Sequence, residues 1–366
     1  MSRNSFGEVF RITTWGESHG KAIGVIIDGC PSGLPLQVEE IDHELELRSP
    51  GKTPWTSPRK EPDKVEILSG VFEGMTTGTP ISLIIWNRDA QSSAYDSLRE
   101  VLRPGHANYT YLSKYGVFDF RGGGRASGRE TACRVAAGAI AKKILAHYNI
   151  KLVAYLSQVG NIAAPKTIIN NLSIEQLRKH SRQSAIFCPD VPTEKAICQH
   201  IESIMQEGDS LGGIVEAIAT NLPVGLGEPV YHKLDAMIAN AMMSLPASKG
   251  FEIGEGFKAA TMRGSAHNDS FIFEKGNIKT KTDHAGGVLG GITTGMPLNI
   301  RVAFKPPSSI NQTQETVDLQ GNKLQLELPA KSRHDPCIAI RAVPVVESML
   351  ALVLVDVLLM NRMTRL

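Results

Sequence analysis

Residues 70–80 read GVFEGMTTGTP, and residues 287–297 repeat the pattern as GVLGGITTGMP. Each copy runs into residues typical of a β-strand. A shorter pair, PSGL at 31–34 and PVGL at 223–226, occurs in the same order. Two echoes in one order indicate two duplicated halves packed on each other, roughly residues 1–150 and 205–345, because a solenoid would need several short repeats.

Predicted elements around these repeats alternate between strands and helices. β-Branched and aromatic runs predict strands at Val9–Thr14, Gly24–Ile27, Ile81–Trp86 and Ile300–Phe304. Apolar spacing and start signals predict helices at Val38–Leu47, Gly128–His147, Pro192–Gln206, Lys233–Ser244 and Val343–Met360. Polar stretches near Lys52–Asp63, Pro165–Ser173 and Asn311–Gly321 are expected to be loops.

The composition is that of an ordinary globular protein. The 366 residues are 42% hydrophobic and 21% charged, with a net charge of +2, which argues against disorder and against binding to duplex DNA or a membrane surface. Five scattered cysteines without a Cys-x-x-Cys pair favour a reducing cytosol over a disulfide framework. The apolar segment Val343–Met360 contains Glu347 and Asp356, so we expect a buried helix rather than a membrane span of ~20 residues.

Common nucleotide and metal motifs are missing from the sequence. It has no phosphate loop, no Gly-x-Gly-x-x-Gly after a strand and no His-Glu-x-x-His, so we predict no metal site. Residues 16–20, GESHG, do match the nucleophile elbow of α/β-hydrolases, which leaves a serine hydrolase using Ser18 as an alternative. That elbow needs a following helix, whereas Gly24–Gly29 is typical of a strand.

Four patches place cations, histidines or hydroxyl groups on turn-forming backbone. They are Ser18-His19, Arg103–Asn108, Arg121–Glu130, and Lys305–Ser309 together with Arg333–Pro336. Ser127 and Glu130 form a predicted capping box, and a helix N-terminus behind a glycine loop is suited to anions. Together the patches predict a pocket for a phosphorylated, carboxylated metabolite with acid chemistry, whereas each residue taken alone is also compatible with a structural role. A non-catalytic protein that binds an anion or a flavin nucleotide is a further alternative.

Six stretches, taken in order, are more specific than any single motif: residues 10–20, 103–106, 119–132, 284–291, 305–310 and 333–347. In this combination, and over nearly the whole chain, the sequence resembles the chorismate synthase family. The resemblance implies a single α+β domain over residues 1–366, a β–α–β sandwich with internal pseudo-twofold duplication. It also implies a lyase that converts 5-enolpyruvylshikimate 3-phosphate to chorismate and phosphate by a 1,4-anti elimination that needs reduced FMN.

The resemblance also implies roles for individual residues. His19 would protonate the departing phosphate, His106 would lie against the reduced flavin, and Asp335, Ser18 and Ser127 would organise the region around flavin N5. A charged imidazole and an arginine cluster would ease departure of the phosphate dianion. The implied FMN contacts are Arg125, Ala126, Ser127, Pro246, Ala247, Gly290, Lys305, Pro306, Pro307, Ser308, Ser309 and Arg333. The implied substrate contacts are Arg48, Arg103, Arg129 and Arg341.

One position departs from the family pattern. Many relatives have a second arginine six residues after Arg48, where this chain has Pro54, and Lys52 or Arg59 are the candidates to replace its charge. The resemblance further implies a homotetramer, and the cysteine usage favours a cytoplasmic location. No nicotinamide motif is visible, so we expect NADPH to act only indirectly, through a separate flavin reductase.

Overall fold

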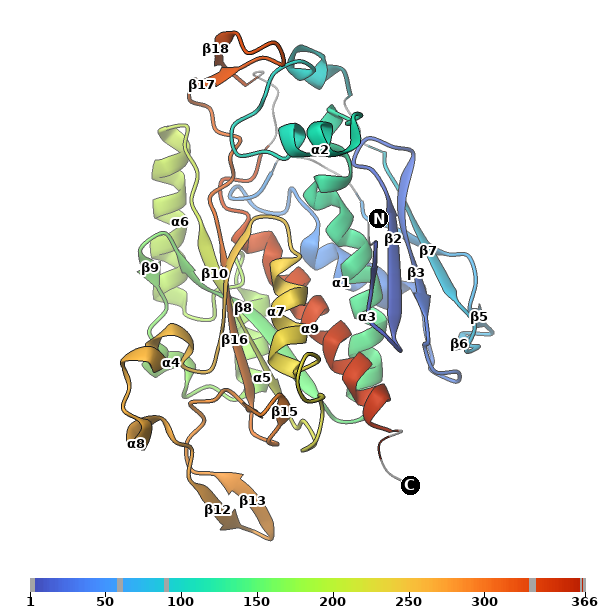
Figure 1. The fold of residues 1–366 in the computed structure, drawn as a ribbon, viewed down its shortest axis with the longest axis vertical. Coiled ribbons are helices and arrows are strands. Elements are labelled where there is room, and N and C mark those ends of the chain that lie inside the picture. The colour runs from blue at the N-terminus through green and yellow to red at the C-terminus, as the bar shows by residue number, and fades with distance from the viewer. Residues whose placement is uncertain (1–3, 58–61, 89–91, 329–333, 363, 365–366) are drawn as a thin grey trace.

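The computed structural model describes residues 4–57, 62–88, 92–328, 334–362 and 364 of the chain. Two five-stranded antiparallel sheets lie on either side of a layer of helices (Figure 1). This layering is a mixed α+β structure with several antiparallel sheets, the class that the sequence predicts.

The first sheet is built from the N-terminal part of the chain. Its order is β1 (Ser5–Phe6), β2 (Arg11–Gly16), β3 (Ala22–Asp28), β7 (Ile81–Trp86) and β4 (Val65–Ile67). In β7 the side chains of Ile81, Leu83 and Ile85 are buried and those between them are more exposed, as expected when one face of a strand lies on the core. All three strands predicted before residue 90 belong to this sheet.

The second sheet is built from the C-terminal part. Its order is β11 (Ser248–Ile253), β16 (Leu298–Phe304), β10 (Gly213–Thr220), β8 (Lys151–Val159) and β9 (Ile162–Ala163). Of these, only β16 is predicted by the sequence.

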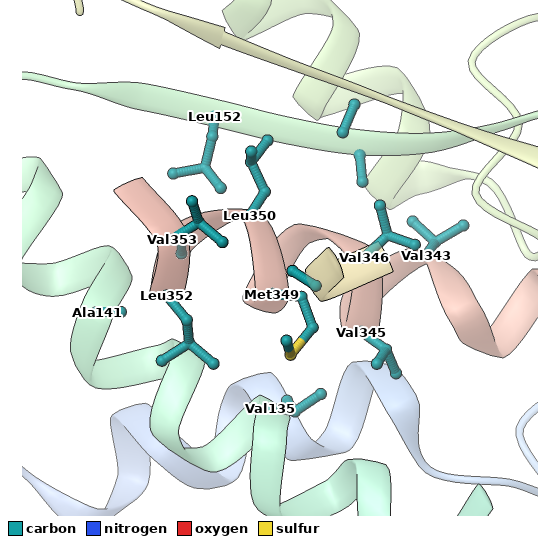
Figure 2. Close-up of a cluster of buried hydrophobic side chains, with 14 of the residues drawn as sticks. Val135, Ala141, Leu152, Val343, Val345, Val346, Met349, Leu350, Leu352 and Val353 are labelled. Carbon is teal, nitrogen blue, oxygen red and sulfur yellow. The ribbon is translucent and has the colours of Figure 1, made fainter. Parts of the chain in front are cut away.

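Four helices lie between the sheets (Figure 1): α1 (Val38–Arg48), α3 (Thr131–His147), α7 (Leu234–Met243) and α9 (Ala339–Asn361). The α9 side chains point to both sides, with Leu350 and Val353 toward Leu152 of β8 and Met349 and Leu352 toward α3 (Figure 2). By length and composition α9 could cross a membrane, but 94% of its most apolar stretch is buried inside the protein. It is a core helix, as predicted.

The remaining elements flank these layers. The helices are α2 (Asn108–Tyr115), α4 (Lys166–Ile169), α5 (Ile174–Gln183), α6 (Val191–Gln206) and α8 (Gly264–His267), and 3-10 turns occur at Ser92–Leu98, Arg121–Ala126, Gly128–Glu130 and Gly256–Thr261. The hairpins are β5 (Val71–Phe72) with β6 (Met75–Thr76), β12 (Phe271–Glu274) with β13 (Asn277–Thr280), β14 (Val288–Leu289) with β15 (Ile292–Thr293), and β17 (Gln314–Val317) with β18 (Lys323–Leu326).

Three local predictions are corrected. The expected loops Pro165–Ser173 and Asn311–Gly321 contain α4 and β17. The expected helix from Gly128 begins with a 3-10 turn, and α3 itself starts at Thr131. The capping box is only half formed: the Ser127 hydroxyl accepts from the Arg129 amide at 3.3 Å, whereas the Glu130 carboxylate turns away to bond Thr14.

The two sheets have corresponding strand orders. The order β2-β3-β7-β4 in the first sheet matches β8-β10-β16-β11 in the second, and each half has a short hairpin, β5–β6 or β14–β15, before its third strand. These two hairpins are the repeated sequences at 70–80 and 287–297. The correspondence therefore extends from strand order to the glycine-rich turns.

The hydrogen bonds of the two turns match as well. The hydroxyl of Thr76 accepts from the Leu34 amide at 2.9 Å and donates to the Pro31 carbonyl at 2.7 Å. The hydroxyl of Thr293 makes the same two bonds, at 2.9 and 2.7 Å, with Leu226 and Pro223. In each half, therefore, a buried threonine of the longer repeat joins its hairpin to the turn formed by the shorter repeat, which lies before a helix.

Candidate functional site

A cavity of about 520 Å³ brings the four predicted patches together. His19, His106, Lys305 and Asp335 all line it, although up to 316 positions separate them in sequence (335 minus 19). Aromatic and aliphatic side chains complete the wall, among them Phe118, Phe120, Phe304, Leu245 and Val345. The volume lies within the ~300–1,000 Å³ usual for small-molecule sites.

Ser18 and His19 reach the cavity from the tight connection between β2 and β3. The Ser18 amide donates to the Gly124 carbonyl at 3.3 Å, and the His19 ring meets Tyr95 edge-on with 5.1 Å between ring centroids. Gly122 packs directly against them, because a Cβ there would lie 2.4 Å from Cδ2 of His19. The glycine loop thus allows the backbone to approach the imidazole closely.

The same connection argues against a hydrolase elbow at Ser18. The chain leaves β2 at Gly16 and enters β3 at Ala22, and every residue between them is described. A nucleophile elbow places its serine between a strand and a helix. Here a strand follows instead, so the structural context of the alternative is missing.

The His106 ring is held between donors and an acceptor. Its Nδ1 lies 2.9 Å from the Pro104 carbonyl oxygen, and its Nε2 lies 3.0 Å from both Arg103 Nη2 and Ser309 Oγ. A carbonyl only accepts and a guanidinium only donates, so these contacts assign the proton to Nδ1 and make Nε2 an acceptor. Burial, and then the Arg103 cation, lower the pKa of His106 to about 4. In this arrangement His106 is a neutral hydrogen-bond acceptor at pH 7.

Arg48 and Arg129 face the cavity on either side of a buried carboxylate, Asp63. Arg48 Nη1 lies 2.8 Å from Asp63 Oδ2, and Arg129 Nη1 pairs with Asp63 Oδ1. The three side chains are only 3%, 4% and 0% exposed, respectively. Burial alone raises the pKa of Asp63, but the two arginines outweigh it and hold that pKa below its usual value.

Asp335 is a partner of a third arginine. Arg341 Nη1 donates to Asp335 Oδ2 at 2.8 Å, and the Ser57 amide donates to Asp335 Oδ1 at 2.8 Å. Arg341 Nε in turn donates to the Arg48 carbonyl at 3.1 Å. One hydrogen-bonded network therefore connects the arginines at 48, 129 and 341 with both carboxylates.

The last patch presents a lysine and hydroxyl groups. Lys305 Nζ donates to the Gly105 carbonyl at 3.1 Å and contacts Ser308 Oγ, and both residues line the cavity with Pro307 and Ser309. Nearby, Arg103 Nε and His334 Nε2 are buried and have no hydrogen-bond partner among the described residues. Two buried nitrogens without partners indicate a wall built to contact a polar ligand.

Some predicted contacts lie elsewhere. Arg125 lines a neighbouring cavity of about 1060 Å³ and donates to the Thr14 carbonyl at 2.8 Å. Ala126, Ser127 and Pro246 line both cavities, and Ala247 lines the first. Gly290, in the β14–β15 turn, and Pro306 are not part of the described wall of the first cavity. Arg333 lies outside the described residues.

The loop after Arg48 does not bring Lys52 to the cavity. Lys52 Nζ pairs with Glu46 at 2.9 Å on the surface, where the two side chains are 44% and 63% exposed. Arg59 lies outside the described residues. His334 lies in the predicted patch Arg333–Pro336 and lines the cavity. The sequence analysis missed Asp63 and the aromatic wall, and nothing local distinguishes Asp63 from other loop carboxylates.

Comparisons with known proteins agree with this site. The family described as "Chorismate synthase" matches residues 10–359. The chain belongs to the chorismate synthase family. Relatives of that name include those of Protochlamydia amoebophila, 58% identical with all of both chains covered, and Archaeoglobus fulgidus, 52% identical over 98% of each. A solved structure described as "Crystal Structure of Chorismate Synthase" is 34% identical, with a TM-score of 0.77, over 96% of this chain and 92% of that one.

Family membership gives the reaction. The enzyme is a carbon–oxygen lyase that converts 5-enolpyruvylshikimate 3-phosphate to chorismate and phosphate in the shikimate pathway. The substrate is a phosphorylated, carboxylated metabolite, as the four patches predict. The family is known to require reduced FMN.

Proposed function

We propose that the 520 Å³ cavity is the place where this chain binds reduced FMN and carries out the elimination. The observation that supports this most directly is the convergence of Arg48, Arg103, Arg129, Arg341 and Lys305 on a single cavity that also holds two histidines. Such a set suits a substrate with phosphate and carboxylate groups, because oriented cations in a partly dry site stabilise anions strongly.

The residues present fit a flavin mononucleotide. The apolar wall, with Phe118, Phe120 and Phe304, suits a flat ring system, and Lys305 with Ser308 and Ser309 suits a phosphate or a polar ring edge. Arg103 Nε and His334 Nε2, which have no hydrogen-bond partner among the described residues, are available to polar ligand atoms. The further contacts proposed are those implied by the resemblance; of these, Arg125, Gly290 and Pro306 lie outside the described wall, and Arg333 lies outside the described residues.

Reduced FMN, when bound, supplies an electron-rich ring next to the reacting carbons. We assign His19 to protonate the phosphate oxygen as its carbon–oxygen bond breaks, since His19 lines the same cavity as the arginine network. Ser18, Ser127 and Asp335 position groups near the carbon that loses its proton. Before a ligand binds, His106 carries its proton on Nδ1, and its Nε2 accepts from Arg103. We propose that a bound anion moves the Arg103 guanidinium away from the imidazole and thereby raises the pKa of His106.

The wider proposals concern partners. We propose a cytoplasmic homotetramer whose flavin is reduced by a separate NADPH-dependent reductase.

We further propose that the matched strand orders and turns reflect internal pseudo-twofold duplication within a single domain. The corresponding turns at Thr76 and Thr293 support this proposal.

An anaerobic assay with chemically reduced FMN and 5-enolpyruvylshikimate 3-phosphate tests the site assignment. We expect equal amounts of chorismate and phosphate from the unaltered protein, and loss of at least ~100-fold in rate for His19→Ala and for His106→Ala with the fold intact. Near-normal turnover by both variants would remove the proposed roles.

FMN binding without turnover would favour a non-catalytic flavin-binding protein, and labelling of Ser18 by a fluorophosphonate would favour the hydrolase. Turnover with NADPH and oxidised FMN alone would show that no separate reductase is needed.

A further inference from the structure

We infer that Asp63 is a positioning residue that holds Arg48 and Arg129 side by side to receive one anionic group of the substrate. This inference rests on the proposed function of the cavity. Asp63 does not line the cavity itself, whereas both arginines do. Its action on the reaction would therefore pass through its two partners.

Each oxygen of the Asp63 carboxylate accepts a hydrogen bond from a different guanidinium. Arg48 Nη1 donates to Oδ2 at 2.8 Å, and Arg129 Nη1 donates to Oδ1. Each arginine is also anchored at its Nε, by Thr131 Oγ1 at 2.9 Å for Arg48 and by Asn87 Oδ1 at 2.9 Å for Arg129. Arg48 Nη2 in addition donates to the Gly128 carbonyl at 3.0 Å. A guanidinium has five N–H donors in a rigid fork, so fixing two edges determines where the remaining donors point.

The arginines come from different parts of the fold. Arg48 is the last residue of α1, and Arg129 lies in the 3-10 turn before α3. Burial lowers the pKa of Arg48 to about 10, and Asp63 opposes that effect. Two buried cations would repel each other and separate without a shared counter-ion. Asp63 thus makes their close approach possible.

Charge and position predict opposite effects when Asp63 is neutralised. Asp63→Asn makes the cavity surroundings more positive by one unit, which by itself would strengthen the binding of an anion and lower KM. The asparagine amide, however, can accept from one arginine only, and its NH₂ group faces the other. If position dominates, one guanidinium is displaced and KM rises.

The experiment is steady-state kinetics of Asp63→Asn with reduced FMN under anaerobic conditions. We expect KM for 5-enolpyruvylshikimate 3-phosphate to rise about tenfold or more, with kcat changed by less than about threefold, because a charged hydrogen bond to the substrate is misaligned. FMN binding should stay within about twofold of the unaltered protein, because the proposed flavin contacts are intact. An unchanged KM, or a lowered KM, would overturn the inference.

Glu347→Gln is the matched control. Glu347 is also a buried carboxylate between two cations, Arg182 and Lys142, each at 2.8 Å, and it does not line the cavity. We expect Glu347→Gln to lower stability while leaving KM unaltered. A similar rise of KM in Glu347→Gln would show that destabilisation alone explains the effect of Asp63→Asn, and would also overturn the inference.

A second variant covers the case in which Asp63→Asn does not fold. Thr131→Val keeps the shape of the side chain and removes one anchor of Arg48, so KM should rise by about threefold. The buried Thr131 hydroxyl also donates to the Gly128 carbonyl at 2.6 Å, so we expect a loss of about 1–3 kcal/mol of stability in a chain that still folds. No rise of KM in that folded variant would overturn the inference. Failure of the unaltered protein to turn over would instead reject the proposed function, so the two failures are distinguishable.

Discussion

Gly122 lies in the cavity wall directly against His19. It has φ +61°, and a Cβ there would lie 2.4 Å from Cδ2 and 2.5 Å from Nε2 of His19. We expect Gly122→Ala to displace His19 and reduce kcat/KM by roughly 100-fold, since misplacing a catalytic group by about 1 Å has effects of that size. Anaerobic kinetics, with circular dichroism to confirm the fold, measure this.

Gly123 supplies the control for backbone strain. It also has a positive φ, +87°, but its nearest neighbour to a new Cβ is Ser127 Cβ at 3.9 Å. Gly123→Ala should therefore lose about 1 kcal/mol or more of stability without a comparable loss of activity. Equal losses of activity in the two variants would mean that loop strain, not contact with His19, controls the rate.

The buried His106 makes a pH-dependent contribution to stability. Its pKa is about 4 in the folded chain, against about 6.5 when unfolded, so the unfolded chain takes up a proton first as pH falls. The contribution is fully present above pH 6.5 and decreases between pH 6.5 and 4. From pH 7.5 to pH 5, we expect the unaltered protein to lose about 2 kcal/mol more of unfolding free energy than His106→Gln does.

Urea denaturation of both proteins at the two pH values measures this difference. Acidic groups titrate in the same range, but they are common to both proteins and cancel in the comparison. A difference that does not change with pH would mean that His106 keeps an ordinary pKa. Saturation with a dianionic ligand should reduce the pH dependence, because a bound anion stabilises the protonated ring.

Single residues were predictable from sequence where local pattern and chemistry coincide. His19, His106, Lys305 and Asp335 stand in turns with glycine, proline or hydroxyl neighbours, and all four line one cavity. Asp63 was not predictable, because its importance arises only when α1 and the turn before α3 bring two arginines to it. The protonation of His106 likewise depends on Arg103 and Ser309, which only the folded chain places beside Nε2.

At the scale of elements, the close packing of α3 on α9 depends on Gly138. A Cβ at this position would lie 2.3 Å from Cβ and 2.8 Å from Cα of Ser348, so the backbone of α9 would have to move. Alanine is favoured over glycine in a helix by about 1 kcal/mol, yet overpacking of a rigid core costs about 1–3 kcal/mol. We expect Gly138→Ala to be destabilising by roughly 1–2 kcal/mol in urea denaturation.

Gly264, at the start of α8, is the comparison position. No atom in the described part of the chain lies within 4 Å of a Cβ built there, so Gly264→Ala should change stability by less than about 0.5 kcal/mol. If Gly138→Ala were as neutral as Gly264→Ala, the helices α3 and α9 would have to be free to separate.

Elements were predictable where one face differs from the other. The helices α1, α6 and α7 and the strand β7 show such patterns and lie within a residue or two of the predicted bounds. The strand β8 is buried along almost its whole length, because α9 covers one face and α5 the other. A strand covered on both faces has a continuous apolar sequence without alternation, which periodicity alone does not distinguish from a helix.

At the scale of the whole molecule, the correspondence between the two halves predicts that equivalent hydrogen bonds contribute similar amounts to the free energy of unfolding. Thr76 and Thr293 are 3% and 1% exposed, and each hydroxyl makes the same two backbone hydrogen bonds. Valine has nearly the same shape but no hydroxyl, so Thr76→Val and Thr293→Val each leave a buried amide and a carbonyl with one partner fewer. We expect each to cost about 1–3 kcal/mol of unfolding free energy, with similar values for the two.

The double variant and a neighbouring control complete this test. Because the two turns belong to different sheets, the costs of Thr76→Val and Thr293→Val should add to within about 0.5 kcal/mol. Thr77 is exposed, and within the described residues its hydroxyl bonds to Thr79 alone, so Thr77→Val should be nearly neutral. A large cost at one threonine and none at the other would show that the halves share a shape without sharing the interaction that holds it, and the energetic equivalence expected of a duplication would be lost.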